Sequence, residues 1–402
     1  MFRTLATPTA ALSYGAIVAL YCFLSPLIVF VRNARTKATL VNLTNAAMSF
    51  ALSYGHPLMT VALPVFQYIF VDGNLVNDYV WSAKVLLLAR QLVPSNMLDF
   101  LCKAGVQIGA FVSLRVAALG LDRASDSPNE FIFTRQRRLL RLNLITNLTR
   151  GAVLIVLMHR SVWYRAACPH YCFLETRPLL DLSCQCAYAD INCVNMSMAN
   201  PESALNSSAI GTHLLYLAIR RCDMPQGIDP LALAPFENLG RIMIFFTNMK
   251  AWEPPLPPST FYVLVRFSQL RTVPNALRKQ LPLSLSTILL EPCPLEDIPD
   301  GVIQAWANIQ TLTLVNVSLN EVPRGLSNLT SLEHLNLRMN NITVLPSWLS
   351  RPSSCLPLIF VRLAWNRITE IPWDLARRGA EVDMSGNPFA VAAGLKIPQP
   401  QI

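Results

Sequence analysis

Charged residues, histidines and the glycine motifs that bind nucleotides are scarce or missing in this sequence. Of its 402 residues, 14% are charged and 52% are hydrophobic, whereas about a quarter of the residues in a typical soluble domain are charged. This balance argues against a wholly soluble domain, and the hydrophobic share argues against a disordered chain. The length allows two or three domains.

Signatures of catalysis are missing as well. The chain contains no G-x-G, no P-loop, no H-E-x-x-H and no G-x-S-x-G, and it has only five histidines. Dinucleotide-binding, nucleoside-triphosphate, zinc-protease and hydrolase chemistry therefore have no support. His170 and His213 lie in or near a cysteine-rich stretch, where a structural role is favoured over catalysis. We expect neither an enzyme nor a bound cofactor or metal.

The excess of positive charge, +9 overall, lies entirely in residues 1–164, which hold 15 Lys/Arg and 6 Asp/Glu. Residues 165–402 hold 18 of each kind. The second part therefore has no net attraction for phosphate, which argues against nucleic-acid binding. In the more apolar first part, basic residues beside apolar runs are typical of the cytoplasmic loops of a membrane protein.

Four stretches in residues 1–164 predict membrane-spanning helices, because a span needs roughly 20 mostly apolar residues. The stretches lie near residues 10–31, 46–70, 101–121 and 142–164. Basic residues follow the first stretch and precede the last, and basic loops favour the cytoplasmic side. Residues 165–402 then face the cell exterior or a lumen. The predicted protein is therefore multi-pass, in the plasma membrane or the secretory pathway.

Charged side chains inside the third apolar region leave a second interpretation open. Arg90, Asp99, Lys103 and Arg115 lie between residues 80 and 121, and a charge within a span suggests function by default. Such residues favour a channel or transporter. The simpler interpretation is that they lie near the membrane surfaces with their charged ends in water.

Eight cysteines follow the last apolar stretch, and an even number on the side predicted to be outside favours disulfides. They are Cys168, Cys172, Cys184, Cys186, Cys193, Cys222, Cys293 and Cys355. The rival is a zinc site that uses Cys168, His170, Cys172, Cys184 and Cys186, but the spacing C-x3-C followed by C-x-C matches no standard finger. The pairing of the cysteines does not follow from the sequence.

Five acceptor sequences for N-glycosylation support the same side. They begin at Asn195, Asn206, Asn316, Asn328 and Asn341. One such tripeptide is a weak signal. Together with the cysteines and the charge bias, five of them favour an exposed domain in an oxidising compartment.

A repeat is the strongest signal in the sequence. Residues 332–346 and 358–372 both fit the template L-x-x-L-x-L-x-x-N-x-L-x-x-L-P. Looser copies carry Ser268, Cys293 and Val317 in place of the asparagine. Eight units start at residues 214, 239, 260, 285, 309, 332, 358 and 379, at spacings of 21–26 residues. Each L-x-L predicts a short strand, and stacked units bury a continuous core.

On these residues, the stretch 214–390 resembles the leucine-rich-repeat superfamily. The whole layout resembles multi-span membrane proteins with a C-terminal repeat domain predicted in oomycetes, which implies an exposed recognition domain. The predicted organisation is an α-helical membrane domain over 1–164, a Cys-rich cap over 165–213, an α/β solenoid over 214–390 and a disordered tail over 391–402. A layout of four spans followed by repeats also resembles the volume-regulated anion channels. The cysteines, the glycosylation sequences and the basic loops argue against that second resemblance.

The resemblance implies that a ligand binds on the concave face, where strand side chains between the template leucines point. Aromatic residues and arginine are enriched among the residues that dominate binding energy. The candidates are Arg241, Phe245, Phe246, Phe261, Tyr262, Arg266, Phe267, Arg338, Arg362 and Trp365. We expect a protein, peptide or glycan ligand, with a membrane co-receptor or a second copy as partner. The alternative is that another part of the chain covers the aromatic residues of the second and third units.

Overall fold

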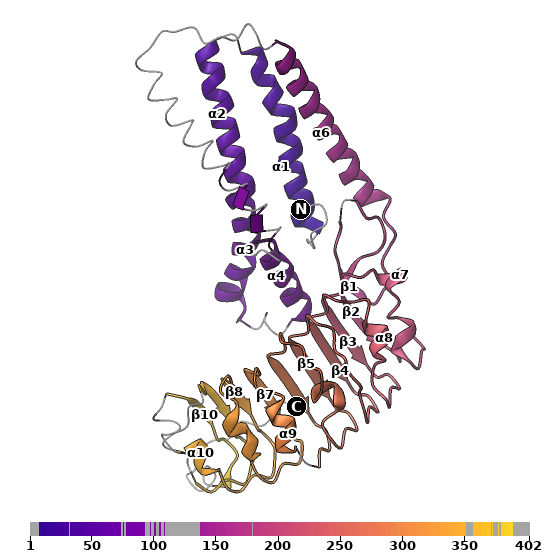
Figure 1. Ribbon diagram of the computed structural model, residues 1–402, viewed down its shortest axis with the longest axis vertical. Coiled ribbons are helices and arrows are strands. Elements are labelled where there is room, and N and C mark those ends of the chain that lie inside the picture. The colour runs from indigo at the N-terminus through magenta and orange to yellow at the C-terminus, as the bar shows by residue number, and fades with distance from the viewer. Residues whose placement is uncertain are drawn as a thin grey trace. The chain divides into compact units, whose positions relative to one another are not determined.

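The computed structural model describes most of the chain (Figure 1). The described residues are 8–31, 33–73, 75, 78–92, 97, 100, 101, 104, 105, 108, 137–178, 180–296, 298–350, 357–370, 372, 377 and 379–388. The chain forms two compact units. A helical unit contains Met1–Cys168 and Leu174–Gln185, and a repeat unit contains Pro169–Phe173 and Cys186–Ile402. The predicted tail, 391–402, lies outside the described residues.

The helical unit is built on the packing of its first and last described helices. Gly15 and Gly151 permit the close approach: a Cβ on Gly15 would lie 2.7 Å from the sulfur of Met158, and one on Gly151 would lie 3.0 Å from the Cβ of Cys22. The helices are α1 (Pro8–Leu27), α2 (Ala34–Phe50), α3 (His56–Phe66), α4 (Tyr79–Leu92) and α6 (Arg137–Trp163), with η1 (Ile28–Phe30), η2 (Ala51–Gly55) and η3 (Gln67–Val71) between them.

The prediction of four membrane-spanning helices is wrong. Among the described residues, no helix is both long enough and apolar enough to cross a membrane. The predicted membrane domain, the transmembrane assignment and the multi-pass location are corrected with it. The stretch near 101–121 is described only at Leu101, Ala104, Gly105 and Ile108.

The breaks between helices account for much of this correction. The apolar run near 46–70 is divided among α2 with 17 residues, η2 with 5, α3 with 11 and η3. The helix α6 has 27 residues but carries five arginines along its length. The helix α1 ends at Leu27, before the predicted end of the first stretch. A count of apolar residues in the sequence does not register where a helix ends.

The repeat unit contains one sheet, whose ten described strands lie side by side in chain order (Figure 1). They are β1 (Cys172–Glu175), β2 (Cys186–Asn192), β3 (Tyr216–Arg220), β4 (Arg241–Phe245), β5 (Tyr262–Arg266), β6 (Thr287–Glu291), β7 (Thr311–Leu314), β8 (His334–Asn336), β9 (Phe360–Arg362) and β10 (Glu381–Asp383). From β2 to β10 every neighbouring pair is parallel. Each strand from β3 onward begins two residues after a predicted unit start.

Stacked apolar side chains form the core of this unit. Leu217, Ile242, Val263, Ile288 and Leu312 occupy equivalent positions of successive strands and are fully buried. One coil alone cannot bury its apolar side, so stability comes from contact between neighbours. The chain returns between strands through short helical turns: η5 (Pro201–Ser203), α7 (Ser207–Ile210), α8 (Pro230–Leu233), η6 (Asn275–Leu277), α9 (Asp300–Gln304), η7 (Arg324–Asn328) and α10 (Ser347–Ser350).

Buried asparagines close the turns after the later strands. The side-chain amide of Asn340 donates to Leu314 O (2.7 Å) and its oxygen accepts from Leu319 N (3.1 Å). Asn366 and Asn387 make the same kind of bond one and two coils further on. The earlier coils have other residues at this position. They are Val194 and Cys222, then Thr247, Ser268, Cys293 and Val317. Cys222 is bonded to Cys193, the residue before Val194.

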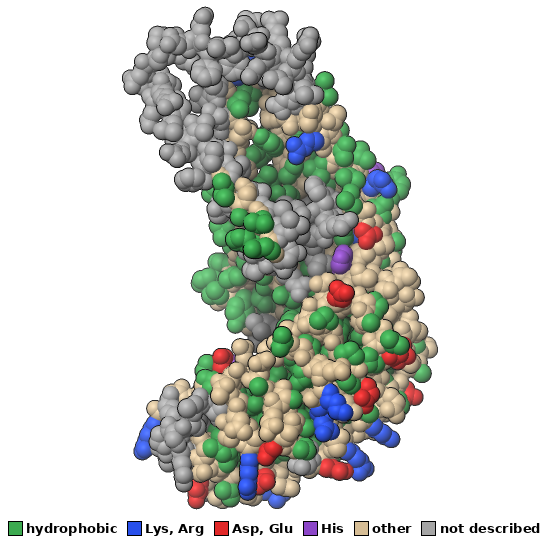
Figure 2. Space-filling model, in the orientation of Figure 1, with side chains coloured by type: hydrophobic (Ala, Val, Ile, Leu, Met, Phe, Trp, Pro, Cys, Tyr) green, Lys and Arg blue, Asp and Glu red, His purple; other side chains and the backbone are tan. Residues whose placement is uncertain are grey.

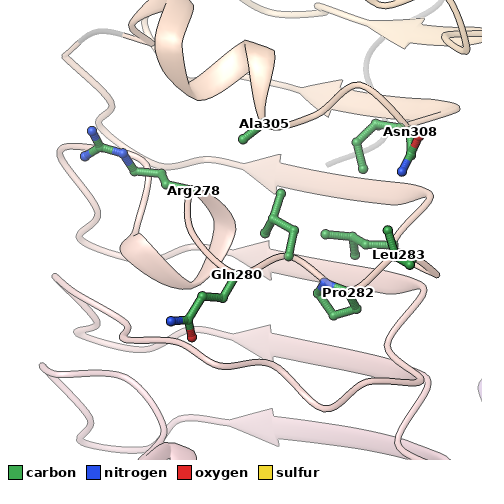
Figure 3. Close-up of a pocket in the computed structure, with 9 residues that line it drawn as sticks. Arg278, Gln280, Pro282, Leu283, Ala305 and Asn308 are labelled. Carbon is green, nitrogen blue, oxygen red and sulfur yellow. The ribbon is translucent and has the colours of Figure 1, made fainter.

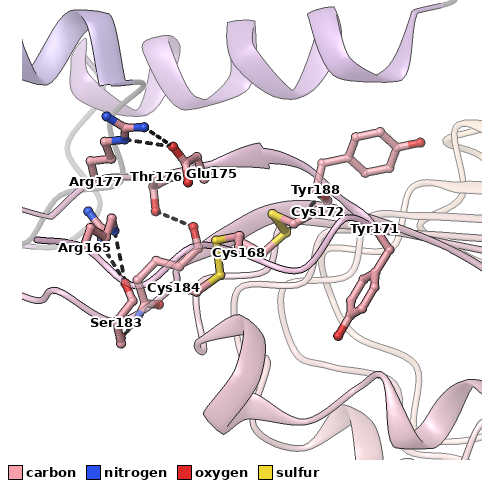
Figure 4. The surroundings of a disulfide bond; sticks show 12 residues. Arg165, Cys168, Tyr171, Cys172, Glu175, Thr176, Arg177, Ser183, Cys184 and Tyr188 are labelled. Carbon is pink, nitrogen blue, oxygen red and sulfur yellow. Dashed lines mark hydrogen bonds and ion pairs between the residues drawn. A yellow bond between two sulfur atoms is a disulfide. The ribbon is translucent and has the colours of Figure 1, made fainter. Parts of the chain in front are cut away.

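The prediction of disulfides is confirmed for six cysteines. The bonds join Cys168 to Cys184, Cys172 to Cys186 and Cys193 to Cys222. Figure 4 shows the first two beside the ion pair of Arg177 with Glu175. Because these sulfurs are bonded to each other, the rival zinc site has no thiolates to use. Among the described residues no cluster of three or more metal-binding side chains occurs.

The prediction of a disulfide at Cys293 is wrong, because its thiol is free and buried; Cys355 lies outside the described residues. Burial raises the pKa of the Cys293 thiol, and the thiolate is the reactive form. We expect iodoacetamide to label Cys293 at least about tenfold more slowly in the folded chain than after unfolding. Mass spectrometry of the peptide that contains it measures both rates, and equal rates would contradict the buried position.

Candidate ligand-binding site

The outward face of the parallel sheet carries three rows of side chains, because alternate residues of a strand point to the same face. The first row is Tyr188, Tyr216, Arg241, Tyr262, Thr287, Thr311, His334, Phe360 and Glu381. The second row is Asp190, Ala218, Met243, Leu264, Leu289, Thr313, Asn336, Arg362 and Asp383. The third row begins with Asn192, Arg220, Phe245, Arg266 and Glu291.

An arginine lies between two tyrosine rings in the first row. The guanidinium carbon of Arg241 is 4.7 Å from the ring centre of Tyr216 and 4.2 Å from that of Tyr262. Tyr188 extends the series with an edge-on contact to Tyr216 at 6.3 Å. A cation over an aromatic face is stabilised by the ring's charge distribution. The predicted ligand-binding residues Arg241 and Tyr262 therefore lie side by side, but the guanidinium of one contacts the ring of the other rather than a ligand.

Two further predicted residues are held by partners in the third row. Arg220 forms an ion pair with Asp190 (2.9 Å) and lies 4.5 Å from the ring centre of Phe245, which is buried. Burial opposes the charge of Arg220, but the neighbouring carboxylate of Asp190 raises its pKa overall. Arg266 pairs with Glu291 on the next strand. In these coils the charges are balanced within the protein.

The second row is apolar and buried in the same coils. Ala218, Met243 and Leu264 are 0–2% exposed. Phe261 lies just before β5, where its ring would touch a Cβ on Gly240 at 2.5 Å. Of the predicted aromatic cluster, Phe245 is buried and Tyr262 packs against Arg241, so both are held by side chains of the repeats themselves. The alternative that another part of the chain covers these aromatics stays a prediction.

The later coils present a different surface. The rings of His334 and Phe360 are stacked at 4.9 Å. Arg362 is exposed and Arg338 is half-buried, and among the described residues neither forms an ion pair. The Nε atom of Arg338 is buried without a hydrogen-bond partner in the described part of the chain. Unlike Arg220 and Arg266, these two arginines keep their charges available for a ligand.

A further row lies at the turns after the strands. Its members, here called the left-handed row, have φ values of 52–60°, a region that is strained for bulky residues and costs about 1–3 kcal/mol each. They are Arg221, Phe246, Phe267, Asn316, Met339 and Trp365. The sequence prediction placed Phe246, Phe267 and Trp365 on the strand face. In the sequence, each of these residues stands directly before the template asparagine position, and that place in the repeat is the signal that assigns it to the turn.

The last coil has Gly386 in the left-handed row, with a φ of 73°. A Cβ there would lie 2.6 Å from the Trp365 ring, so Gly386→Ala combines backbone strain with a clash. We expect it to destabilise the chain by about 2–3 kcal/mol, with a shift in tryptophan emission. Gly379→Ala is the matched control: its φ is 87° but nothing lies near the added methyl. Equal losses in both variants would show that the ring contact contributes nothing.

The glycosylation candidates remain predictions. Asn195, Asn206, Asn316, Asn328 and Asn341 are all exposed. The side chain of Asn206 also begins α7 by accepting from Ser208 N at 2.9 Å. A glycan on Asn316 would extend from the left-handed row rather than from a strand.

The residues that sequence reasoning missed are mainly the partners of the predicted ones. Tyr188 and Asp190 belong to β2, a coil that starts before the first predicted unit at 214. Glu291 was a strand residue without a stated role. An acidic residue at the same strand position as an arginine one coil away is the signal that could have identified the pair of Arg266 with Glu291.

A pocket of about 250 Å³ is formed by the connections that lead into β6 and β7, not by these rows. Its lining includes Pro282 and Leu283, while Figure 3 shows the polar ends of Arg278 and Gln280 directed away from them. Pockets for small ligands are usually 300–1,000 Å³. This one does not support a small-molecule substrate as the main ligand.

Residues 331–352, which contain β8 and Asn340, match the family model described as Leucine Rich Repeat. These residues form a leucine-rich repeat. Solved structures that match the chain include a leucine-rich-repeat protein of Leptospira interrogans, 15% identical with a TM-score of 0.38. The match covers 44% of this chain and half of that protein's length. No curated protein matches the sequence, and the resemblance to oomycete membrane proteins gains no support.

Proposed function

We propose that the leucine-rich repeats form a recognition domain that binds a protein or peptide through the outward face of β8–β10. Domains of this type typically bind proteins without catalysing a reaction. The observation that carries the proposal is the pair Arg338 and Arg362, whose charges are not neutralised by an ion pair among the described residues. The stacked rings of His334 and Phe360 lie on the same strands.

The chemistry of this surface favours an acidic segment with an aromatic or aliphatic side chain. Guanidinium groups bind carboxylates through two parallel hydrogen bonds. Aromatic side chains add apolar area with little loss of rotamer freedom. In Figure 2, charged side chains of both signs are gathered on the repeat unit, while hydrophobic ones dominate the described part of the helical unit in view.

The test is a selection of random peptides displayed on phage against the full chain. We expect enrichment of sequences with Asp or Glu beside an aromatic residue, and at least tenfold weaker binding of those peptides to the variant Arg338→Gln, Arg362→Gln, which corresponds to about 1.4 kcal/mol. Arg324→Gln, an exposed arginine in η7, is the matched control. Unchanged binding to the double variant would contradict the proposed site.

A further inference from the structure

Phe246 and Phe267 are the two members of the left-handed row that contradict ordinary side-chain preference most clearly. Both have positive φ, 53° and 57°, where glycine and asparagine are favoured and bulky residues are outliers. Both are also exposed, at 51% and 36%. A phenylalanine that is strained and exposed contributes little to the core, so its presence calls for another explanation.

The two rings present a single apolar surface. They come from equivalent turns after β4 and β5 and are stacked at 4.6 Å with an angle of 10° between their planes. Stacking with each other stabilises the pair but leaves half of the Phe246 side chain in contact with solvent. Other coils have Asn316 or Gly386 at the same position, so the fold does not need a ring there.

A cation adjoins this surface. Arg221 occupies the left-handed row one coil before Phe246, is exposed, and forms no ion pair among the described residues. Strand residues next to it differ: Arg220 is paired with Asp190, and Arg266 with Glu291. The turn edge therefore offers aromatic area with an unneutralised positive charge beside it.

We propose that Arg221, Phe246 and Phe267 form a second binding surface, for a segment of a partner protein that carries an aromatic side chain next to a carboxylate. The aromatic group of the partner extends the stacked pair, and its carboxylate binds the guanidinium of Arg221. The surface lies in the coils of β3–β5, so it is separate from the proposed site on β8–β10 and does not depend on it.

The conformation of the two phenylalanines makes a sharp test possible. In Phe246→Gly and Phe267→Gly the ring is lost, and the strain of a positive φ is lost with it. If the rings serve binding, these variants keep or raise the melting temperature while they lose affinity. If the rings serve folding, the melting temperature falls. Met339→Gly, which changes the same position in another coil, is the matched control.

Binding is measured by fluorescence anisotropy with a fluorescein-labelled peptide of alternating aspartate and tryptophan. The full chain carries Arg338→Gln and Arg362→Gln throughout, so that the site on β8–β10 cannot supply the signal. We expect each phenylalanine variant and Arg221→Gln to weaken binding at least tenfold, and Met339→Gly to leave it unchanged. A peptide of alternating lysine and tryptophan, and one of aspartate and alanine, should bind at least tenfold more weakly than the probe.

Three results would overturn the proposal. One is that the probe binds Phe246→Gly or Phe267→Gly as tightly as the parent. Another is that these variants, but not Met339→Gly, lower the melting temperature, which would assign the rings to folding. The third is that the lysine peptide binds as well as the aspartate peptide, which would exclude the role of Arg221. Because the background lacks the two arginines of the first site, none of these results depends on the proposed function.

Discussion

Replacing both Cys193 and Cys222 with alanine is expected to lower the free energy of unfolding of the repeat unit by about 3–4 kcal/mol. The bond joins residues 29 apart, and closing a loop of that length restricts the unfolded chain by an amount of this size. Both cysteines are almost fully buried. Cys222 occupies the position that asparagine has in the later coils, and Cys193 lies one residue before the equivalent position of its own coil. Once the bond is lost, the side-chain oxygens of Asn192 and Asn248 still accept from Asn195 N (3.3 Å) and Met224 N (2.8 Å), but neither amide lies at the buried template position.

The loss should be local, because the coils of a solenoid contact only their neighbours. Hydrogen exchange of the full chain should therefore show faster exchange in β2 and β3, and unchanged exchange in β8 and β9. Removal of the bond between Cys168 and Cys184 is the matched control, since both cysteines lie in the helical unit. Protection of β2 and β3 that survives the first double variant would show that the bond is dispensable for the fold.

The repeat template predicted the strands well because it encodes buried positions directly. All eight predicted units contain a strand that begins at their third residue. The template missed the coil of β2, where Cys186, Ala189 and Ile191 stand at the leucine positions and Val194 stands at the asparagine position. The disulfide between Cys193 and Cys222 joins the turns of β2 and β3, where the later coils use asparagine amides. A pattern of leucines and asparagines does not represent a disulfide.

The candidate site was predicted only in part. Side-chain types identified Arg241, Arg266 and the aromatic residues as facing outward, but not which charges are already neutralised. The partner of Arg220 is Asp190, 30 residues earlier in the chain. Such a pairing depends on the register between neighbouring coils. Here it depends on the register of β2 with β3, and β2 belongs to the coil that the template missed.

The helical part was predicted least well, for a related reason. The apolar stretch near 46–70 was interpreted as one span, whereas the helix there changes character at Ala51 and again at His56. Composition reports how apolar a stretch is, and it does not report where backbone hydrogen bonding changes. The leucine template succeeds because it specifies positions rather than an average.

Asn340→Ala is the second substitution for which a large effect is expected, about 3 kcal/mol of stability. The amide of Asn340 bonds to Leu314 O at 2.7 Å, and its oxygen accepts from the backbone of Val317 and Leu319, both at 3.1 Å. Alanine leaves these buried groups without a partner, and each such group costs about 1–3 kcal/mol. Urea unfolding of the full chain, followed by circular dichroism, gives the size of the loss.

The adjacent Asn341→Ala is a matched control, because Asn341 is exposed and its replacement should change stability by no more than about 0.5 kcal/mol.

The two variants also test where along the repeats the buried asparagine amides begin. Asn340 is the first of the series Asn340, Asn366 and Asn387, and it bonds backward to a coil that has Val317 at the equivalent position. Hydrogen exchange should therefore accelerate at β7 and β8 before it does so at β9. Equal losses in Asn340→Ala and Asn341→Ala would mean that water replaces the amide at no cost, and that leucine packing alone determines the order of the coils.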